Sequence, residues 1–135
     1  MNVLILGDII GLPGREAVKL NLKNIIKENK IDFTVVNGEN AANDGYGITK
    51  KNALELFEAG ADVITSGNHI WDKSEIIDFI QKETRLLRPS NLAIGSPGKG
   101  FEIYSSKNGK YKIAVINLMG NVFMRKTEDV FVAAK

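Results

Sequence analysis

The fold is indicated first by a stretch near the N-terminus with the sequence Val3-Leu4-Ile5-Leu6-Gly7-Asp8. Its four apolar residues are continuous and stop at a glycine and a carboxylate, a pattern typical of a short strand buried on both faces. From about Arg15 to Asn29, apolar side chains recur at the spacing of an amphipathic helix. The two segments together predict one strand–helix unit.

The same unit recurs further along the chain. Residues 33–37 predict a second strand, which ends in Gly38-Glu39-Asn40. A polar loop follows, and a helix is expected from Thr49, as its N-cap, to about Ala59, with Gly60 ending it.

A third unit begins with a strand at residues 63–66, which ends in Gly67-Asn68-His69. Asp72 and Glu75 have the spacing of a capping box, with Asp in place of the usual Ser or Thr, and predict a helix after them. Buried strands that alternate with amphipathic helices predict right-handed crossovers. We therefore expect an α/β fold with a mainly parallel sheet flanked by helices.

The rest of the chain predicts less regular structure. Residues 88–100 carry two prolines and three glycines and are expected to form a loop that contains a short strand at residues 92–94. Residues 101–104 and 111–117 predict a hairpin with Asn108-Gly109 at its turn.

The C-terminal residues resemble the start of a helix. Residues 127–129 are expected to cap a helix that begins at about Val130, and no helix-stop signal follows before Lys135. We therefore expect residues 1–135 to form a single domain that is the N-terminal part of a longer one, truncated before its C-terminal strands. A truncated sheet exposes an apolar edge and face, which predicts a homo-oligomer.

Composition excludes several classes of function. The 135 residues are 44% hydrophobic and 25% charged, and a net charge of +2 gives no argument for binding nucleic acid or a membrane surface. The absence of cysteine excludes a disulfide scaffold, a thiolate zinc site and a cysteine nucleophile, and it fits a cytoplasmic protein. No apolar stretch approaches the ~20 residues that cross a bilayer, and no signal peptide is present, so we expect no membrane partner.

Each of the three predicted strands ends in a turn with a glycine and a side chain that can bind a metal. The carboxyl ends of parallel strands share one edge, so these turns are expected to converge. Asp and Asn are also ordinary turn formers and helix caps, but Glu39 fits neither role, and His69 lies in a polar loop, where binding residues concentrate. The turns contribute two carboxylates, two carboxamides and the one imidazole of the sequence: Asp8, Glu39, Asn40, Asn68 and His69.

These residue types suit phosphoryl transfer at a pair of divalent cations. Such cations accept carboxylate, carbonyl and imidazole ligands, and paired metals about 3.5–4 Å apart are suited to this reaction. We expect Glu39 to bridge two metals, with Asp8 and Asn40 on one and Asn68 on the other. His69 is expected to stay off the metals and protonate the leaving oxygen, because an imidazole with its unperturbed pKa of about 6.5 suits neutral pH.

Other phosphate and nucleotide motifs do not match. The glycines of residues 7–14 have the wrong spacing for a dinucleotide fingerprint, and residues 95–100 lack the spacing and the following helix of a P-loop. Ile10 stands where an aspartyl-phosphate enzyme usually has a second aspartate, and no Gly-x-Ser-x-Gly elbow occurs.

Three segments together resemble the YmdB-like branch of the calcineurin-like metallophosphoesterases. They are Gly7-Asp8-Ile9-Ile10-Gly11 with Gly14-Arg15, Asn37-Gly38-Glu39-Asn40-Ala41-Ala42 and Gly67-Asn68-His69-Ile70-Trp71-Asp72, and residues 88–91, 95–100 and 117–120 continue the match. The resemblance covers essentially the whole chain. By position it implies Asp8, Glu39, Asn40 and Asn68 as metal ligands and His69 as the catalytic acid.

The resemblance also implies a cofactor and a substrate class. The cofactor is two divalent metal ions, iron or manganese in most members, with magnesium or zinc as alternatives. The reaction is hydrolysis of phosphodiesters, and the implied substrates are 2′,3′-cyclic nucleotides, other small phosphodiesters and RNA ends.

The sequence departs from this family in its histidines. The family completes both metals with histidines from later loops, and this chain has none after His69. Residues 1–135 alone are therefore expected to lack a complete two-metal site, which a longer chain or a partner would complete. The alternatives are a non-catalytic metal- or nucleotide-binding regulatory domain of the same fold, or a nucleotide-binding α/β protein that uses only its Gly-rich turns.

Three further residues have two interpretations each. Arg15, near the Asp8 turn, is a candidate for contact with a substrate phosphate or for a surface ion pair. Lys99, in a Gly-rich loop, is a second candidate for a phosphate contact. Trp71 could stack on a base, although an aromatic residue in such a loop more often packs locally.

Overall fold

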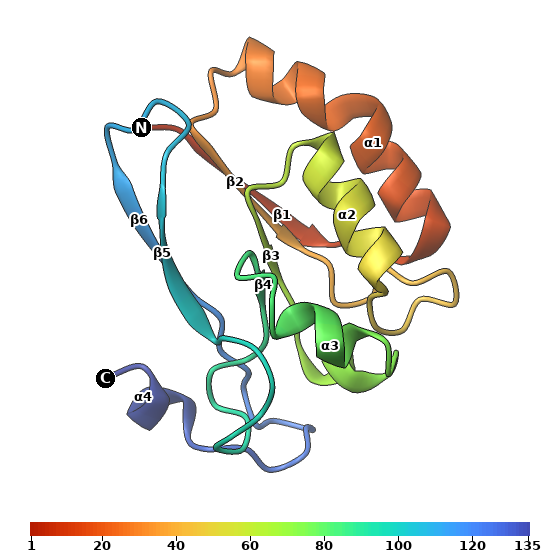
Figure 1. Cartoon of the computed structure of the whole chain (residues 1–135), viewed down its shortest axis with the longest axis vertical. Coiled ribbons are helices and arrows are strands. Elements are labelled where there is room, and N and C mark those ends of the chain that lie inside the picture. The colour runs from red at the N-terminus through yellow and green to blue at the C-terminus, as the bar shows by residue number, and fades with distance from the viewer.

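The computed structural model of residues 1–135 has a four-stranded parallel sheet with helices on one face and a two-stranded hairpin on the other (Figure 1). The order of strands in the sheet is β1-β2-β3-β4, and the hairpin is β5-β6. The predicted α/β fold with a mainly parallel sheet is confirmed. In chain order the elements are β1 (Val3–Asp8), α1 (Gly11–Glu28), β2 (Phe33–Asn37), α2 (Lys50–Ala59), β3 (Val63–Thr65), the 3₁₀ helix η1 (Asn68–Trp71), α3 (Ile76–Ile80), β4 (Leu86–Leu87), β5 (Phe101–Ser105), β6 (Lys112–Ile116) and α4 (Val130–Ala133).

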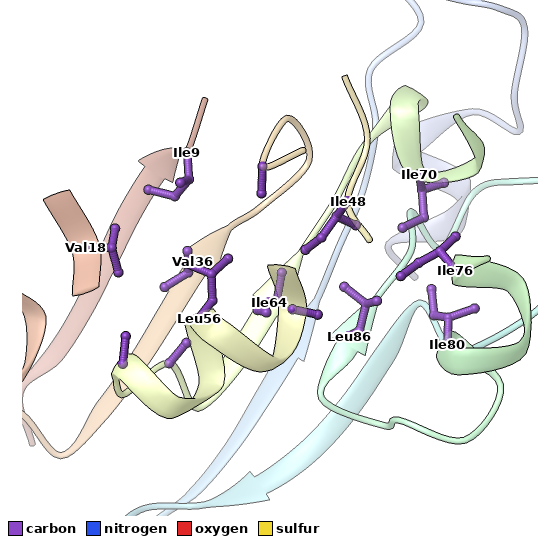
Figure 2. Close-up of a cluster of buried hydrophobic side chains, with 14 of the residues drawn as sticks. Ile9, Val18, Val36, Ile48, Leu56, Ile64, Ile70, Ile76, Ile80 and Leu86 are labelled. Atoms are coloured by element: carbon purple, nitrogen blue, oxygen red, sulfur yellow. The ribbon is translucent and has the colours of Figure 1, made fainter. Parts of the chain in front are cut away.

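Alternation along the strands divides the core into two layers, because successive side chains of a strand point to opposite faces. Val36, Ile64 and Leu86 join the main core beneath the helices (Figure 2). Val63 and Leu87, their neighbours in the chain, face the hairpin instead. The smaller layer between the sheet and the hairpin also contains Phe33, Val35, Tyr104, Ile113 and Val115.

Strand β1 is an edge strand, and the expectation that both its faces are buried is wrong. Leu4 and Leu6 pack against the main core, whereas Val3 and Ile5 are 40% and 72% exposed. Val3 and Ile5 face the hairpin side, but the hairpin packs on β2, β3 and β4 and leaves this part of β1 uncovered. A continuous apolar run therefore does not distinguish a central strand from this edge strand.

Helices α1 and α2 lie on the other face of the sheet. Helix α1 begins at Gly11, four residues before the predicted start, because Pro13 lies in the first turn, where the helix does not need its missing N–H. Helix α2 begins and ends as predicted. Thr49 is its N-cap in a capping box with Asn52, and Gly60 ends it with a φ of 122°.

The capping box expected at Asp72 is wrong. Residues 68–71 form η1 instead, and α3 begins at Ile76 without a side-chain cap. The Glu75 carboxylate is used elsewhere: it accepts a hydrogen bond of 3.1 Å from the backbone N–H of Lys50, at the start of α2. This carboxylate therefore serves the terminus of a different helix.

The strand expected at residues 92–94 is also wrong. These residues form bends and turns, and Ile94 is fully exposed. The fourth strand of the sheet is instead β4, which pairs with β3. The hairpin and the C-terminal helix are confirmed, and Asp129 caps α4 by accepting from two backbone N–H groups. No helix is both long enough and apolar enough to span a membrane.

Candidate active site

The three predicted ligand-bearing turns lie at one edge of the sheet. Asp8 is the last residue of β1, Glu39 and Asn40 directly follow β2, and Asn68 and His69 begin η1 after β3. These strands are parallel neighbours in the order β1-β2-β3, so their carboxyl ends meet. The topology therefore brings together residues that are up to 61 positions apart in the sequence.

Asn40 connects the first turn to the third. Its amide nitrogen donates to Asp8 Oδ2 at 2.7 Å, and its amide oxygen lies 2.7 Å from Nδ1 of His69. Since an amide oxygen only accepts, Nδ1 of His69 must carry the proton in this bond. Nε2 is then the nitrogen left for a substrate, on a side chain that is 29% exposed.

Glu39 lies against the same histidine. Its Oε1 accepts from the backbone N–H of His69 at 3.3 Å and is 3.8 Å from Nδ1 of the ring. The backbone N–H of Glu39 itself donates to Asn37 Oδ1 at 2.9 Å, which fixes the turn after β2. The carboxylate packs directly over Gly67, where a side chain would collide with it.

Asn68 is the one predicted ligand outside this network. It is the first residue of η1, its side chain is exposed, and the side chain makes no hydrogen bond within the chain. The structure thus brings Asp8, Glu39, Asn40 and His69 into contact and leaves Asn68 beside them in the chain.

The donor set agrees in kind with a divalent cation. Carboxylate and amide oxygens from two adjacent turns are within a hydrogen-bonded cluster, and such oxygens suit magnesium, manganese or iron. Nowhere in the chain do three His, Cys, Asp or Glu side chains gather closely enough to hold a metal by themselves. The amide oxygens of Asn40 and Asn68 are therefore needed in any ligand set built from these residues.

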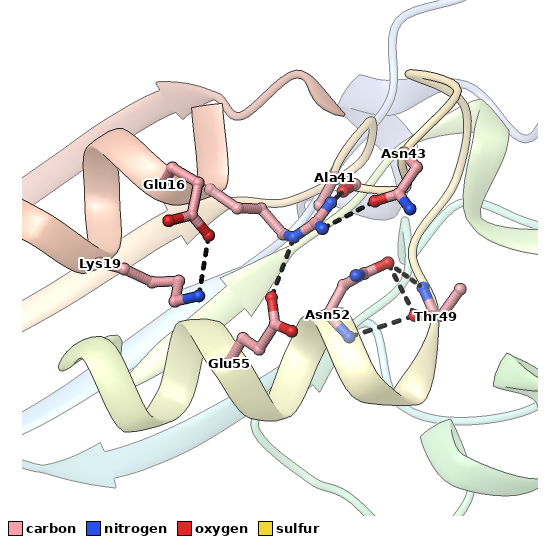
Figure 3. A network of polar contacts seen from close by, with 8 residues as sticks. Glu16, Lys19, Ala41, Asn43, Thr49, Asn52 and Glu55 are labelled. Atoms are coloured by element: carbon pink, nitrogen blue, oxygen red, sulfur yellow. Dashed lines mark hydrogen bonds and ion pairs between the residues drawn. The ribbon is translucent and has the colours of Figure 1, made fainter. Parts of the chain in front are cut away.

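Arg15 is buried beside the site and is bound to protein groups. It is 4% exposed, its Nε donates to Glu55 Oε2 at 3.1 Å, and its Nη2 donates to Asn43 Oδ1 at 2.8 Å. Figure 3 labels its partners Glu55, Asn43 and Ala41. Nη1 donates to the carbonyl oxygen of Ala41, next to Asn40. The guanidinium therefore ties the segment after the site to α2.

The side chains of Lys99 and Trp71 contact other parts of the protein. The Lys99 ammonium forms an ion pair with Glu102, which lowers the pKa of that carboxyl from its ordinary value. The side chain of Trp71 is partly buried against the main core. The structure shows no contact between Lys99 and the four clustered residues.

Two buried asparagines join distant segments of the chain, and one of them, Asn117, reaches the turn beside the site. Asn117 donates to the carbonyl oxygens of Ser66 at 2.8 Å and Leu87 at 3.0 Å, which joins the end of β6 to the turn before Gly67. Asn91 is fully buried and bonds to both backbone groups of Met119. Nothing in their local sequence indicates these partners, because they lie 28 to 51 residues away.

Tyr46 is a further residue that the sequence analysis missed. Its ring packs edge-on with the ring of His69, with 5.2 Å between the centroids and an interplanar angle of 81°. The signal that could have found it is an aromatic residue between two glycines in the loop that follows the Glu39 turn.

Solved structures define the class of this fold. A crystal structure of a phosphatase from Mycoplasma pneumoniae matches with a TM-score of 0.87 and 33% identity, over 98% of this chain and 48% of that one. A crystal structure of a hypothetical protein from Thermus thermophilus matches with a TM-score of 0.90 and 37% identity, over 99% of this chain and 51% of that one. The fold is that of the metallophosphoesterase-type phosphatases.

The chain belongs to the YmdB-like protein family, whose model matches residues 4–135. A relative from Bacillus subtilis (strain 168), a 2′,3′-cyclic-nucleotide 2′-phosphodiesterase, is 47% identical over 134 residues, which are 99% of this chain and 50% of the relative. The chain therefore spans about half the length of the curated relative.

Proposed function

We propose that the protein is a metal-dependent phosphodiesterase that hydrolyses 2′,3′-cyclic nucleotides at the sheet edge where β1, β2 and β3 end. The observation that carries this proposal is the hydrogen-bonded series Asp8–Asn40–His69, with 2.7 Å at each step. It connects a carboxylate that can bind a cation to an imidazole that has one nitrogen free. The activities named for the Bacillus relative and the Mycoplasma phosphatase support the reaction class.

A pair of divalent metals, iron or manganese, is part of this proposal. The residues that would hold them are Asp8, Glu39, Asn40 and Asn68, all through oxygen. When bound, such metals neutralise charge on the phosphate and lower the pKa of the water that attacks it.

His69 supplies the proton in the proposed reaction. Its Nε2–H donates to the oxygen that leaves phosphorus, so that the alcohol departs neutral and the ring keeps its proton on Nδ1. Asn40 holds that second proton in place and so prevents rotation of the ring. Glu39 fixes the backbone of η1 through the N–H of His69, and this positions the ring relative to the cation ligands.

Hydrolysis of 2′,3′-cyclic AMP tests the proposal directly. The longer protein that contains these residues is expected to be active when it is supplied with Mn²⁺ or Fe²⁺, and chelation is expected to abolish the activity. Glu39→Ala should lower kcat/KM by more than about a hundredfold, since loss of even a supporting residue at a metal site costs 10–100-fold. Glu58→Ala removes an exposed carboxylate on α2 and should leave the rate unchanged. Activity that survives both chelation and Glu39→Ala would refute the mechanism.

A non-catalytic binding domain is the second candidate, and one observation favours it. No three His, Cys, Asp or Glu side chains gather to form a metal site in residues 1–135. Calorimetric titration with Mn²⁺ tests this candidate. Tight binding of two ions by residues 1–135 contradicts a regulatory domain, whereas weak binding at a single site supports it for these residues and leaves the longer protein to the activity assay. The homo-oligomeric state and cytoplasmic location expected from the sequence remain predictions.

A further inference from the structure

Tyr46 lies beside the proposed catalytic imidazole without taking part in the core. The residue is 57% exposed, it belongs to neither hydrophobic cluster, and its hydroxyl has no hydrogen-bond partner within the chain. Its one described aromatic contact is the edge-on packing with His69. Folding therefore gives no reason for a large aromatic side chain at this position.

The loop that carries Tyr46 is held firmly in place. The N–H of Ala42 donates to the carbonyl oxygen of Gly47 at 2.8 Å, which closes the loop on itself. The Lys73 ammonium lies 2.6 Å from Asp44 Oδ2, joins the loop to the segment after η1, and holds the pKa of Asp44 below its ordinary value. These contacts fix the position of Tyr46 relative to His69 before any ligand arrives.

Gly47 brings the backbone of this loop close to the backbone of η1. Its φ of +75° favours glycine, and a β-carbon there would lie 3.0 Å from the carbonyl oxygen of His69. The loop and η1 therefore pack backbone to backbone. This contact helps to keep the Tyr46 ring beside the His69 ring.

The position of Tyr46 determines what it can touch in a substrate. Nδ1 of His69 is occupied by Asn40, so the leaving oxygen must approach Nε2. Whatever is attached to that oxygen then lies next to the imidazole, whose ring centroid is 5.2 Å from that of Tyr46. In a cyclic nucleotide the attached group is the nucleoside.

We infer that Tyr46 is a specificity-determining residue that stacks against the nucleoside on the leaving-group side of the phosphate. This inference rests on the proposed function, because it takes His69 as the proton donor. An exposed aromatic ring provides a flat apolar surface for any base, and stacking of this kind is tolerant of base identity. The residue should thus favour nucleotides over simple alkyl phosphates and discriminate weakly among bases.

Two ligands that differ only in the nucleoside test the inference. Adenosine 3′-monophosphate and methyl phosphate are titrated into the protein with Mg²⁺, a diamagnetic cation that oxygen ligands accept. Binding is followed through the ring protons of His69, which give one assignable set of signals because the sequence has one histidine. The variants are Tyr46→Leu, Tyr46→Phe and Tyr111→Leu, the last a half-exposed tyrosine beside β6 as matched control.

Tyr46→Leu is expected to weaken binding of the nucleotide by about tenfold, as loss of one base-stacking ring does, and to leave methyl phosphate unchanged. Tyr46→Phe and Tyr111→Leu should both bind the nucleotide as the wild type does. An unchanged nucleotide affinity in Tyr46→Leu, or an equal loss for both ligands, would overturn the inference and leave the proposed function standing. If neither ligand shifts the His69 signals of the wild type, the inference is overturned, and the hydrolysis assay on the longer protein decides the proposed function separately.

Discussion

The carboxylate of Glu39 occupies the space where a β-carbon on Gly67 would lie. Such an atom would be 2.1 Å from Glu39 Oε2 and 2.4 Å from the carboxyl carbon. The φ of Gly67 is −149°, outside the left-handed region that favours glycine, so the close approach of Glu39 is the physical reason for the residue. The glycine of the Gly-Asn-His turn is therefore part of the site.

Gly67→Ala should displace the Glu39 carboxylate and leave the fold intact. We expect loss of Mn²⁺ affinity and of phosphodiesterase activity by about a hundredfold, comparable to loss of a supporting group at a metal site. Calorimetry and an activity assay measure the effect, with circular dichroism as the check on folding. Gly120→Ala is the control, because a β-carbon there meets no atom within 4 Å. Equal metal affinity in Gly67→Ala and wild type would contradict this account.

Arg15→Lys should destabilise the protein by about 2 kcal/mol. A lysine cannot reproduce the fork that bonds Glu55, Ala41 and Asn43, and breaking a buried charged network leaves acceptors without partners. Urea unfolding measures the change. If Arg15 instead binds a substrate phosphate, the variant will raise KM while the unfolding midpoint stays constant. Lys19→Ala removes an exposed ion pair on the same helix and should leave the midpoint unchanged.

Thr34→Val should stabilise the protein by about 1 kcal/mol. The Thr34 hydroxyl is fully buried and has no hydrogen-bond partner, so its desolvation is uncompensated. The same change at Thr49 should act in the opposite direction by about 1 kcal/mol, since that side chain caps α2. Thermal unfolding of the two variants compares the signs, and a destabilised Thr34→Val would show that the hydroxyl has a partner.

The contribution of Glu83 to stability should depend on pH. Its hydrogen bonds with Arg85 hold the pKa of the Glu83 carboxyl below the ordinary 4.5 in the folded state. The stabilisation is therefore complete above the unfolded-state pKa and is lost as the pH falls through the lowered folded-state value. Wild type should have a higher urea midpoint than Glu83→Gln at neutral pH, and the difference should disappear in acid. A difference that persists unchanged at low pH would contradict the assignment.

The exposed apolar side chains of β1 and β5 should promote self-association. Ile5 is 72% exposed and Ile103 59% exposed, each on a strand with further exposed apolar residues. The double variant Ile5→Thr/Ile103→Thr is expected to elute as a smaller species in size-exclusion chromatography with light scattering. Ile94→Thr, in a loop, should not change the elution. A wild-type protein that elutes as a monomer would contradict the prediction of a homo-oligomer.

Local sequence was sufficient for the elements whose determinants lie close in the chain. Thr49 and Gly60 mark the two ends of α2, because capping groups act within one turn of the helix. Gly109 allows the hairpin to turn because it adopts a positive φ of +71°. The shared edge of β1, β2 and β3 followed from the parallel topology, which is why Asp8, Asn40 and His69 could be placed together before their contacts were known.

The features that could not be predicted from the sequence depend on partners that are distant in the chain. The two residues of β4 form a strand because Leu86 pairs with Ile64, and no local pattern separates them from the loop that follows. The burial of Arg15 depends on Glu55, forty residues away, so its sequence neighbours could not distinguish a structural guanidinium from a phosphate contact. The position of Tyr46 beside His69 likewise depends on loop closure through Lys73.

The amide of Asn117 links the hairpin to the turn after β3, at the edge of the sheet that carries the candidate site. Ser66, whose carbonyl it holds, directly precedes the glycine beneath Glu39. Opening of β5 and β6 would remove this anchor of the turn before Gly67. The candidate site therefore takes part of its mechanical support from two strands that contribute no predicted ligand to it.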